Sequence, residues 1–221
     1  MNEETIRRLI RRAAPSAPLI GRKNYMDAAV IVPLIYISGE YHLLFQQRSE
    51  NIPQGNEICF PGGEFDPSLD KTLEQTALRE TVEELGIGMD RIGLTGRLGT
   101  LVTVRGMAID CFVAMLNTKT VDELAINRAE VARVFTLPLS WFMEHEPVRY
   151  FLRVQIHSRI VDCDGTPVTL FPARELDLPS RYWESWYGKD RPAVVYKTPE
   201  GPVWGVTAEI VEELVNRLVE V

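Results

Sequence analysis

The 221-residue sequence has few of the residues that build zinc sites and disulfide frameworks. It contains three cysteines and three histidines, and neither set shows a ligand spacing such as Cys-x-x-Cys. The odd number of cysteines, and their positions in mostly apolar runs, predict buried thiols in a reducing compartment. The cysteines are Cys59, Cys111 and Cys163.

Long apolar runs and an excess of positive charge are also missing. No stretch approaches the roughly 18 apolar residues that a membrane-spanning helix needs, and the chain begins with an arginine-rich segment that has no apolar signal core. We therefore expect a cytoplasmic protein with no membrane partner. The 24 Lys and Arg against 31 Asp and Glu give a formal net charge of −7. This charge argues against a nucleic-acid partner, because a phosphate backbone is repelled by it.

Internal repeats, low-complexity tracts and linkers are absent as well, so we expect one domain over residues 1–221 with its core at about 27–219. An amphipathic helix is predicted over residues 3–14, and the C-terminal residues 207–219 also have helical spacing. Residues 172–191 show no clear period and are expected to form a loop. The predicted strands are 27–37, 41–47, 92–104, 107–116, 132–136, 149–161, 167–171, 194–197 and 202–207, with a short one ending at 60.

A further helix is predicted over residues 69–85, ended by Gly86, and one side of it is acidic. At about 100° per residue, Glu80, Glu83 and Glu84 fall on that side. A solvated acidic face is the simplest interpretation of such a triplet taken alone. The alternative is a site for Mg²⁺ or Mn²⁺, because hard divalent cations need anionic oxygens that converge on one point. The apolar side of this helix is expected to comprise Leu78, Val82 and Leu85.

The residues around the acidic triplet favour the cation site. Gly62 and Gly63 precede the helix, and a glycine pair allows the close backbone approach that suits a carbonyl ligand or a pyrophosphate. Arg79 lies four residues before Glu83 and can hold that carboxylate in place. A surface ion pair is the other interpretation of this arginine.

The same residues resemble the Nudix box, a glycine followed after a spacer by Arg-Glu-apolar-x-Glu-Glu-x-Gly-apolar. The sequence departs from the box at Thr81, which takes an apolar position, and at Lys71, which takes the position of a glutamate. Asp70 and Glu74 are the candidates for that missing carboxylate. The matching residues are Gly63, Arg79, Glu80, Glu83, Glu84, Gly86 and Ile87.

Segments outside the box are similar to those of coenzyme A diphosphatases, a branch of the Nudix family. The segment with Arg48-Ser49 resembles the signature that precedes the box in this branch, and Asn127 to Leu139 resembles its Asn-Pro-x-Glu-Val segment. Trp204-Gly-Val-Thr207-Ala resembles its closing Trp-Gly-x-Thr-Ala, although we expect the Trp204 ring in the core rather than stacked on a base.

The resemblance implies an α/β fold: an α/β/α sandwich with a mixed sheet and a loop–helix–loop catalytic motif. It also implies a hydrolase that uses Mg²⁺ or Mn²⁺ to cleave the pyrophosphate of a nucleoside diphosphate derivative. The expected substrate is coenzyme A or an acyl-CoA, which gives 3′,5′-ADP and (acyl-)4′-phosphopantetheine. Hydrolysis of ADP-ribose or NADH is the runner-up, and a ligand-sensing module without hydrolysis is the alternative from another class. The expected partner is thus a small nucleotide, and a homodimer stays open.

The resemblance implies catalytic, substrate-binding and metal-binding roles for particular residues. Glu130, in the Asn-x-x-Glu-Val segment, is expected to be a general base or an additional metal ligand. Arg48 is the first candidate for a substrate phosphate contact and Arg105 the second, although Arg48 has a hairpin cap as its simpler interpretation. The expected residues are Glu83, Glu130 and Arg79 for catalysis, Arg48, Arg105, Gly62 and Gly63 for the substrate, and Glu80, Glu83 and Glu84 for the metal.

Overall fold

The computed structural model describes residues 19–219, so the helix predicted over residues 3–14 lies outside the described residues. Contacts divide the chain into two compact units, of which the larger comprises Met1–Val148 with Val195–Val221 and the smaller comprises Arg149–Val194. The expectation that residues 1–221 form one domain stays a prediction.

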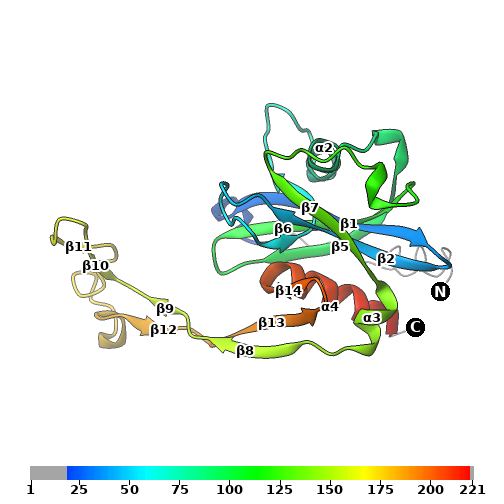
Figure 1. Cartoon of the computed structure of the whole chain (residues 1–221). Helices are drawn as coiled ribbons and strands as arrows, with labels where there is room; N and C mark the ends of the chain where they lie inside the picture. Colours follow the sequence, from blue (N-terminus) through cyan, green and yellow to red (C-terminus); the bar gives the residue numbers. More distant parts are fainter. Residues whose placement is uncertain (1–18, 220–221) are drawn as a thin grey trace. The chain divides into compact units, whose positions relative to one another are not determined.

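The larger unit is built on a mixed sheet, as predicted (Figure 1). Its strands are β1 (Met26–Ile37), β2 (Glu40–Arg48), β3 (Ile58–Cys59), β4 (Gly62–Glu64), β5 (Ile92–Val102), β6 (Met107–Leu116) and β7 (Val131–Pro138). The order is β3-β2-β1-β6-β5, with β7 also paired to β2. β1 runs parallel to β6, whereas the other pairs of this sheet are antiparallel.

β1 has two partners along its other edge. Its first half pairs with β4, with Val30 opposite Gly62, and its last residues pair with β2, with Leu34 opposite Leu43. Pro33 lies between these two stretches. β1 therefore brings the glycine pair and β2 to the same side of the central strand.

Helices cover both faces of this sheet, which confirms the α/β/α sandwich. In Figure 1, α2 (Leu73–Leu85) lies on one face and α4 (Gly205–Val219) on the other. α2 packs on a cluster of buried residues that includes Ala29, Ile31 and Phe112. The remaining helical segments of this unit are η1 (Arg22–Asn24), η2 (Met89–Arg91), η3 (Val121–Glu123) and α3 (Leu139–Glu144).

The ends of α2 are set by local caps. The helix begins at Leu73 rather than at residue 69, because the Oγ1 atom of Thr72 accepts a hydrogen bond from the Gln75 N–H at 3.2 Å. Before the cap, residues 66–70 form a turn in which the Asp66 carbonyl accepts the Asp70 N–H. The predicted end is confirmed, because Gly86 adopts the left-handed conformation with φ 61°.

The buried side of α2 differs from the predicted one. Leu78 and Val82 are only partly buried, and of the three expected residues Leu85 alone is fully buried. The side facing the sheet includes Thr81, whose hydroxyl is satisfied by donating to the Ala77 carbonyl at 2.7 Å. Because its hydroxyl is paired within the helix, Thr81 can be buried against the sheet. A pattern based on apolar residues alone does not detect such a position. The buried residues of α2 are Thr76, Ala77, Thr81, Glu84 and Leu85.

The C-terminal strand pair and helix occur as predicted, with one exception in burial. β13 (Arg191–Thr198) pairs with β14 (Gly201–Trp204), and α4 follows directly. Trp204 is 45% exposed, so its placement in the core was wrong. Side chains alternate along a strand, and the neighbouring Val203 takes the buried side with 0% exposure.

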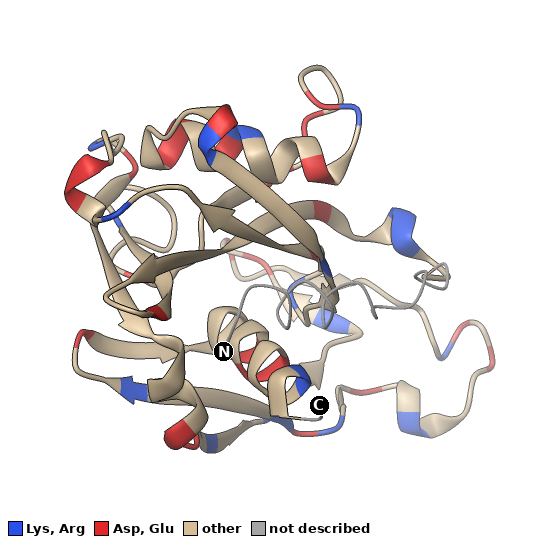
Figure 2. Cartoon of the chain, turned by 90° about the vertical axis from the view of Figure 1, so that its right-hand side faces the viewer, with Lys and Arg blue, Asp and Glu red and all other residues tan. Residues whose placement is uncertain are grey.

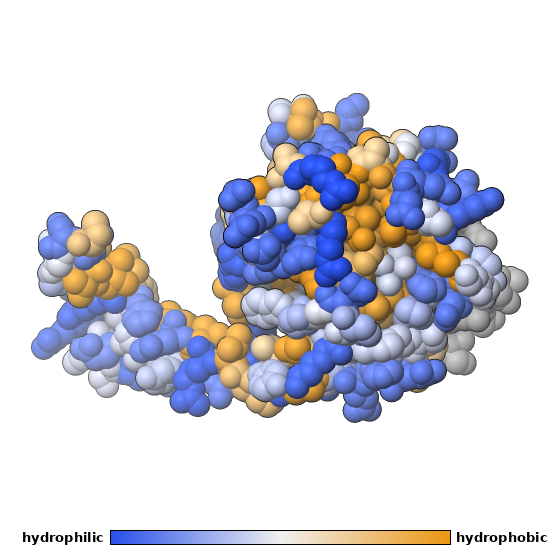
Figure 3. Space-filling view, in the orientation of Figure 1, coloured by the Kyte–Doolittle hydropathy of each residue, from blue (hydrophilic) through white to orange (hydrophobic). Residues whose placement is uncertain are grey.

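The smaller unit is a set of short strands with a small apolar interior. Its buried apolar residues are Ala173 and Val194, and ten of its large apolar side chains are exposed; Figure 3 shows hydrophobic side chains on its surface. The loop predicted over 172–191 contains η4 (Ser180–Tyr182) and β12 (Trp186–Tyr187), whose short lengths leave no readable period. The other strands here are β8 (Val148–Leu152), β9 (Gln155–Ile156), β10 (Arg159–Val161) and β11 (Pro167–Thr169).

The cysteines are free thiols, but their burial differs from the prediction. Cys111 is buried, Cys59 is partly exposed, and Cys163 is exposed. The prediction was wrong for Cys163 because this residue lies in the turn between β10 and β11. Within residues 19–219, the helices are all too short or too polar to cross a membrane. The cytoplasmic location stays a prediction.

Candidate active site

The glycine pair lies against the glutamates of α2. The Gly62 N–H donates to Oε2 of Glu84 at 2.9 Å. Gly62 has φ 154°, and a Cβ atom there meets the carbonyl oxygen of Ala29, so this position requires glycine. A Cβ atom at Gly63 lies 2.5 Å from the Cδ atom of Glu80. The absence of two side chains therefore allows β4 to approach two carboxylates of the helix.

Arg79 connects the helix carboxylates to one another. Its Nη1 atom donates to Glu80 Oε1 at 2.8 Å and to Glu83 Oε2 at 3.0 Å. Its Nε and Nη2 atoms bind the carboxylate of Asp70, the Nη2 contact being 2.9 Å. The expected contact with Glu83 is confirmed, and the arginine is more than a surface ion pair.

Asp70 and Glu74, the two candidates for the missing box carboxylate, differ in their contact with Arg79. It is buried in the turn before α2 and binds Arg79, whereas Glu74 is exposed on the first turn of the helix. The hydrogen bond from Arg79 holds the pKa of Asp70 below its usual range. Of the two candidates from the sequence, the structure thus selects Asp70 as the partner of the arginine.

The three helix glutamates differ in burial. Glu84 is only 3% exposed, which contradicts its expected place on a solvated face, because Gly62 covers it. Burial raises the pKa of Glu84 to about 7. Burial also raises the pKa of the half-buried Glu80, with like charge from Glu83 and Glu130 acting in the same direction. Figure 2 shows the mixture of acidic and basic residues along α2, at the top of the view.

Two other expected residues lie near these glutamates. The Glu130 carbonyl accepts the Ser49 N–H at 2.8 Å, which ties its turn to the end of β2, and its charge acts on Glu80. Arg48 donates from Nε to the Pro53 carbonyl at 3.1 Å, and its charge lowers the pKa of Glu84 against the larger effect of burial. The roles of both residues stay predictions.

Arg105 does not join this cluster. It lies in the exposed turn between β5 and β6. Among the contacts described for residues 19–219, none connects it with Glu80, Glu83 or Glu84. Its contact with the substrate stays a prediction.

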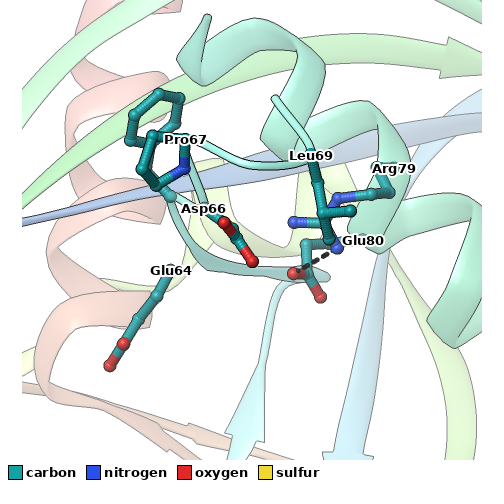
Figure 4. A pocket seen from close by; sticks show the side chains of 7 residues that line it. Glu64, Asp66, Pro67, Leu69, Arg79 and Glu80 are labelled. Atoms are coloured by element: carbon teal, nitrogen blue, oxygen red, sulfur yellow. Dashed lines mark hydrogen bonds and ion pairs between the residues drawn. The ribbon is translucent and has the colours of Figure 1, made fainter. Parts of the chain in front are cut away.

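A pocket of about 400 Å³ opens beside the box helix (Figure 4). The Asp66 carboxylate points toward Glu80, and the dashed line marks the ion pair of Glu80 with Arg79. Sequence reasoning missed the acidic residues of this pocket outside the helix, although Glu64 and Asp66 lie within three residues after the glycine pair. The lining residues are Glu64, Phe65, Asp66, Pro67, Leu69, Arg79 and Glu80.

The donors of this site fit a hard divalent cation by their chemistry. They are carboxylates, and the buried Glu84 has a pKa raised to about 7, so a cation is an apt counter-charge for it. In the described part of the chain, no three His, Cys, Asp or Glu side chains are close enough to share one ion. Arg79 binds Glu80 and Glu83 instead, so cation binding requires these carboxylates to turn from the arginine.

Comparison with known proteins places this site in a family. The family model of the NUDIX domain matches residues 25–158. Nudix hydrolase 3 of Caenorhabditis elegans is 27% identical over 161 residues, 70% of this chain and 66% of the relative. The uncharacterized Nudix hydrolase NudL of Photorhabdus laumondii is 27% identical over 205 residues, 92% of this chain and 91% of the relative.

A third relative carries a more specific name. The mitochondrial coenzyme A diphosphatase NUDT8 of Homo sapiens is 32% identical over 142 residues, 63% of this chain and 60% of the relative. The chain thus spans less than two thirds of the human and the nematode relative. Because the NUDIX family model matches more than half of the sequence, the chain belongs to the Nudix hydrolase family.

Proposed function

We propose that this protein hydrolyses the pyrophosphate bond of coenzyme A or an acyl-CoA in a reaction that depends on Mg²⁺ or Mn²⁺. The observation that carries the proposal is the contact of Glu84 and Glu80 with the glycine pair of β4, together with Arg79, which pairs with both Glu80 and Glu83. In the reaction, the oxygen of water attacks one phosphorus and the bond from that phosphorus to the bridging oxygen breaks. The products are two phosphate monoesters, 3′,5′-ADP and (acyl-)4′-phosphopantetheine.

The residues of this chain have separate tasks in the proposal. Glu80, Glu83 and Glu84 hold the cations, and Arg79 pairs with Glu80 and Glu83 while no cation is bound. When bound, Mg²⁺ or Mn²⁺ neutralises the pyrophosphate oxygens and lowers the pKa of water. Glu130 accepts the proton of the attacking water. A ligand-sensing module has no need for an intact set of three carboxylates.

Two relatives support the choice of coenzyme A. The human relative is named as a coenzyme A diphosphatase, and so is the peroxisomal NUDT7 of Mus musculus, which is 33% identical over 123 residues, 55% of this chain and 50% of the relative. Coenzyme A differs from ADP-ribose by its 3′-phosphate and its pantetheine arm. In the proposal Arg48 binds the 3′-phosphate, because it is a cation beside the carboxylate cluster.

The test is a hydrolysis panel with product identification by mass spectrometry. Coenzyme A, an acyl-CoA, dephospho-coenzyme A, ADP-ribose and NADH are compared with Mg²⁺ and with Mn²⁺. We expect the highest kcat/KM for coenzyme A or the acyl-CoA. Faster hydrolysis of ADP-ribose or NADH overturns the substrate and keeps the reaction type, and no hydrolysis of any compound overturns both.

The role of Arg48 is tested by the ratio of kcat/KM for coenzyme A and dephospho-coenzyme A. A charge-assisted contact is worth roughly 1.5–3 kcal/mol, or about 10- to 150-fold. Arg48→Ala is expected to remove most of this preference, whereas Arg105→Ala is expected to retain it. The opposite result assigns the 3′-phosphate contact to Arg105.

A further inference from the structure

Gln46 is a buried polar residue on the face of the sheet that carries the box helix. It lies on β2 with 0% exposure. Side chains alternate along a strand, so Gln46 shares its face with Leu44, which packs on Leu85 of α2. Phe45 lies on the opposite face, where its ring stacks on other aromatic rings. An apolar residue is the ordinary occupant of such a position, and the amide needs another explanation.

The amide of Gln46 lies near Glu84, the buried glutamate of the site. Within the described residues, neither its Nε2 nor its Oε1 atom has a hydrogen-bond partner of good geometry. The amide is nevertheless near enough to favour the ionised forms of Glu84 and Cys59, against the larger effect of burial on both pKa values. Cys59 lies opposite Gln46 in the β2–β3 register. A buried amide without a partner destabilises the fold, so it is explained best by a partner that it gains in another state.

We propose that Gln46 is a positioning residue for Glu84: its Nε2–H group donates to the Glu84 carboxylate in the cation-bound protein and fixes the orientation of that carboxylate together with the Gly62 N–H. The inference rests on the proposed metal dependence. One donor leaves the carboxylate free to rotate, whereas two donors from different strands fix its plane. Groups that orient a ligand in this way typically contribute 10- to 100-fold to metal affinity.

The strands that supply the two donors are held independently of the helix. Gly62 belongs to β4, which is hydrogen-bonded to β1, and Gln46 belongs to β2, between β3 and β7. Glu84 itself is on α2. The orientation of this carboxylate is therefore set by the sheet, even when Arg79 exchanges its partners.

The test measures Mn²⁺ affinity directly, by the electron paramagnetic resonance signal of free Mn²⁺, without substrate. Gln46→Met keeps the size of the side chain and removes the amide, and we expect Mn²⁺ to bind about 10- to 100-fold more weakly. The midpoint of thermal unfolding in EDTA is expected to equal or exceed that of the parent, because an unpartnered amide is lost. Gln47→Met is the matched control on the other face of the strand, and Cys59→Ala removes the other neighbour of the amide; both are expected to keep the parent affinity.

A second variant keeps the test decisive if Gln46→Met does not fold. Gln46→Asn retains an amide but withdraws it by one methylene, and the same weakening of Mn²⁺ binding is expected. Parent-like Mn²⁺ affinity in the variants overturns this inference alone. Parallel loss of affinity and unfolding midpoint in both variants assigns Gln46 to the packing of the fold and also overturns it. A parent protein that binds no Mn²⁺ overturns the proposed function together with the inference.

Discussion

The guanidinium of Arg79 is bound by the buried carboxylate of Asp70, with an Nη2–Oδ2 distance of 2.9 Å. Asp70 takes one edge of the guanidinium, and Nη1 reaches Glu80 and Glu83 from the other. The position of the arginine thus depends on a residue outside the helix.

Asp70→Asn is expected to lower both stability and turnover. Loss of the charged hydrogen bonds costs about 1.5–3 kcal/mol at pH 7. The pKa of Asp70 is lower in the folded protein than its ordinary value of 3.8. The ionised carboxylate therefore stabilises the folded state above pH 3.8, and this contribution is lost as the pH falls through the folded-state pKa. Urea unfolding of parent and variant between pH 7 and pH 3 measures this difference, which should shrink below about pH 4. Glu74→Gln is the control with no expected change, and a difference that is constant with pH contradicts the prediction.

Glu83→Gln and Glu84→Gln are expected to lower kcat by orders of magnitude but to differ in stability. The Glu83 side chain is 53% exposed, so its variant should unfold at the parent temperature. The pKa of Glu84 is raised to about 7, so its stabilising protonation is lost as the pH rises through 7. At pH 8 in EDTA the parent therefore carries a buried charge, and Glu84→Gln should unfold at a higher temperature. Equal unfolding temperatures for the parent and Glu84→Gln contradict this assignment.

Gly63→Ala is expected to reduce kcat at least about 100-fold with little effect on stability, because positions near reacting groups tolerate only small displacements. The added Cβ atom lies 2.5 Å from the Cδ atom of Glu80, and the flexible end of that side chain moves away. Gly99→Ala is the matched control, since its Cβ atom meets only an Arg217 nitrogen at 3.8 Å. Comparable rates in the two variants would show that the approach of Gly63 to Glu80 has no part in catalysis.

Glu130→Gln is expected to lower kcat by about 10²–10⁴-fold if Glu130 is the general base. The side chain is exposed and the hydrogen bond to Ser49 uses the backbone carbonyl, so the fold should be retained. The pH–rate profile provides the second measurement, because loss of the base removes the acidic limb of kcat. A rate near that of the parent removes Glu130 from the mechanism.

One cysteine is expected to react rapidly with a thiol reagent in the native protein. Burial raises the pKa of Cys59 to about 11 and that of Cys111 to about 12, which leaves little thiolate at pH 8. Cys163 is exposed and should react first. Labelling should modify one thiol in the native protein and three in urea, located by mass spectrometry of peptides, and Cys163→Ser should abolish the rapid phase. Rapid labelling of Cys111 contradicts the burial described above.

The sequence predicted the features that local chemistry determines. Gly86 ends α2 because only a residue tolerant of the left-handed conformation fits there, and this signal is local. The grouping of Glu80, Glu83 and Glu84 follows from the helical period. The mixed sheet and the sandwich came from the resemblance, whose motifs cover several strands.

Features that depend on distant partners were not predictable in the same way. Helical periodicity gives relative angles on α2 but does not say which angle faces the sheet, so Leu78 and Val82 were placed on the buried side. Glu84 is buried because β4 approaches it, and the identity of that neighbour is absent from the helix sequence. Gln46 carried one readable signal: it shares a strand face with Leu44, and a polar residue there interrupts an apolar side.

One edge of β1 is shared by β4 and β2, so the composition of the site depends on how these two strands are aligned with β1. The Ile31 N–H donates to the Pro61 carbonyl, and Pro33, two residues later, points the same way and has no N–H to donate. The strand therefore lacks a donor where its partner changes from β4 to β2. A slip of one residue in β2 would turn Gln46 and Arg48 to the opposite face of the sheet. One edge of β1 thus branches to two strands, β4 and β2. The register of these two strands on β1 determines which of their side chains lie next to the box helix.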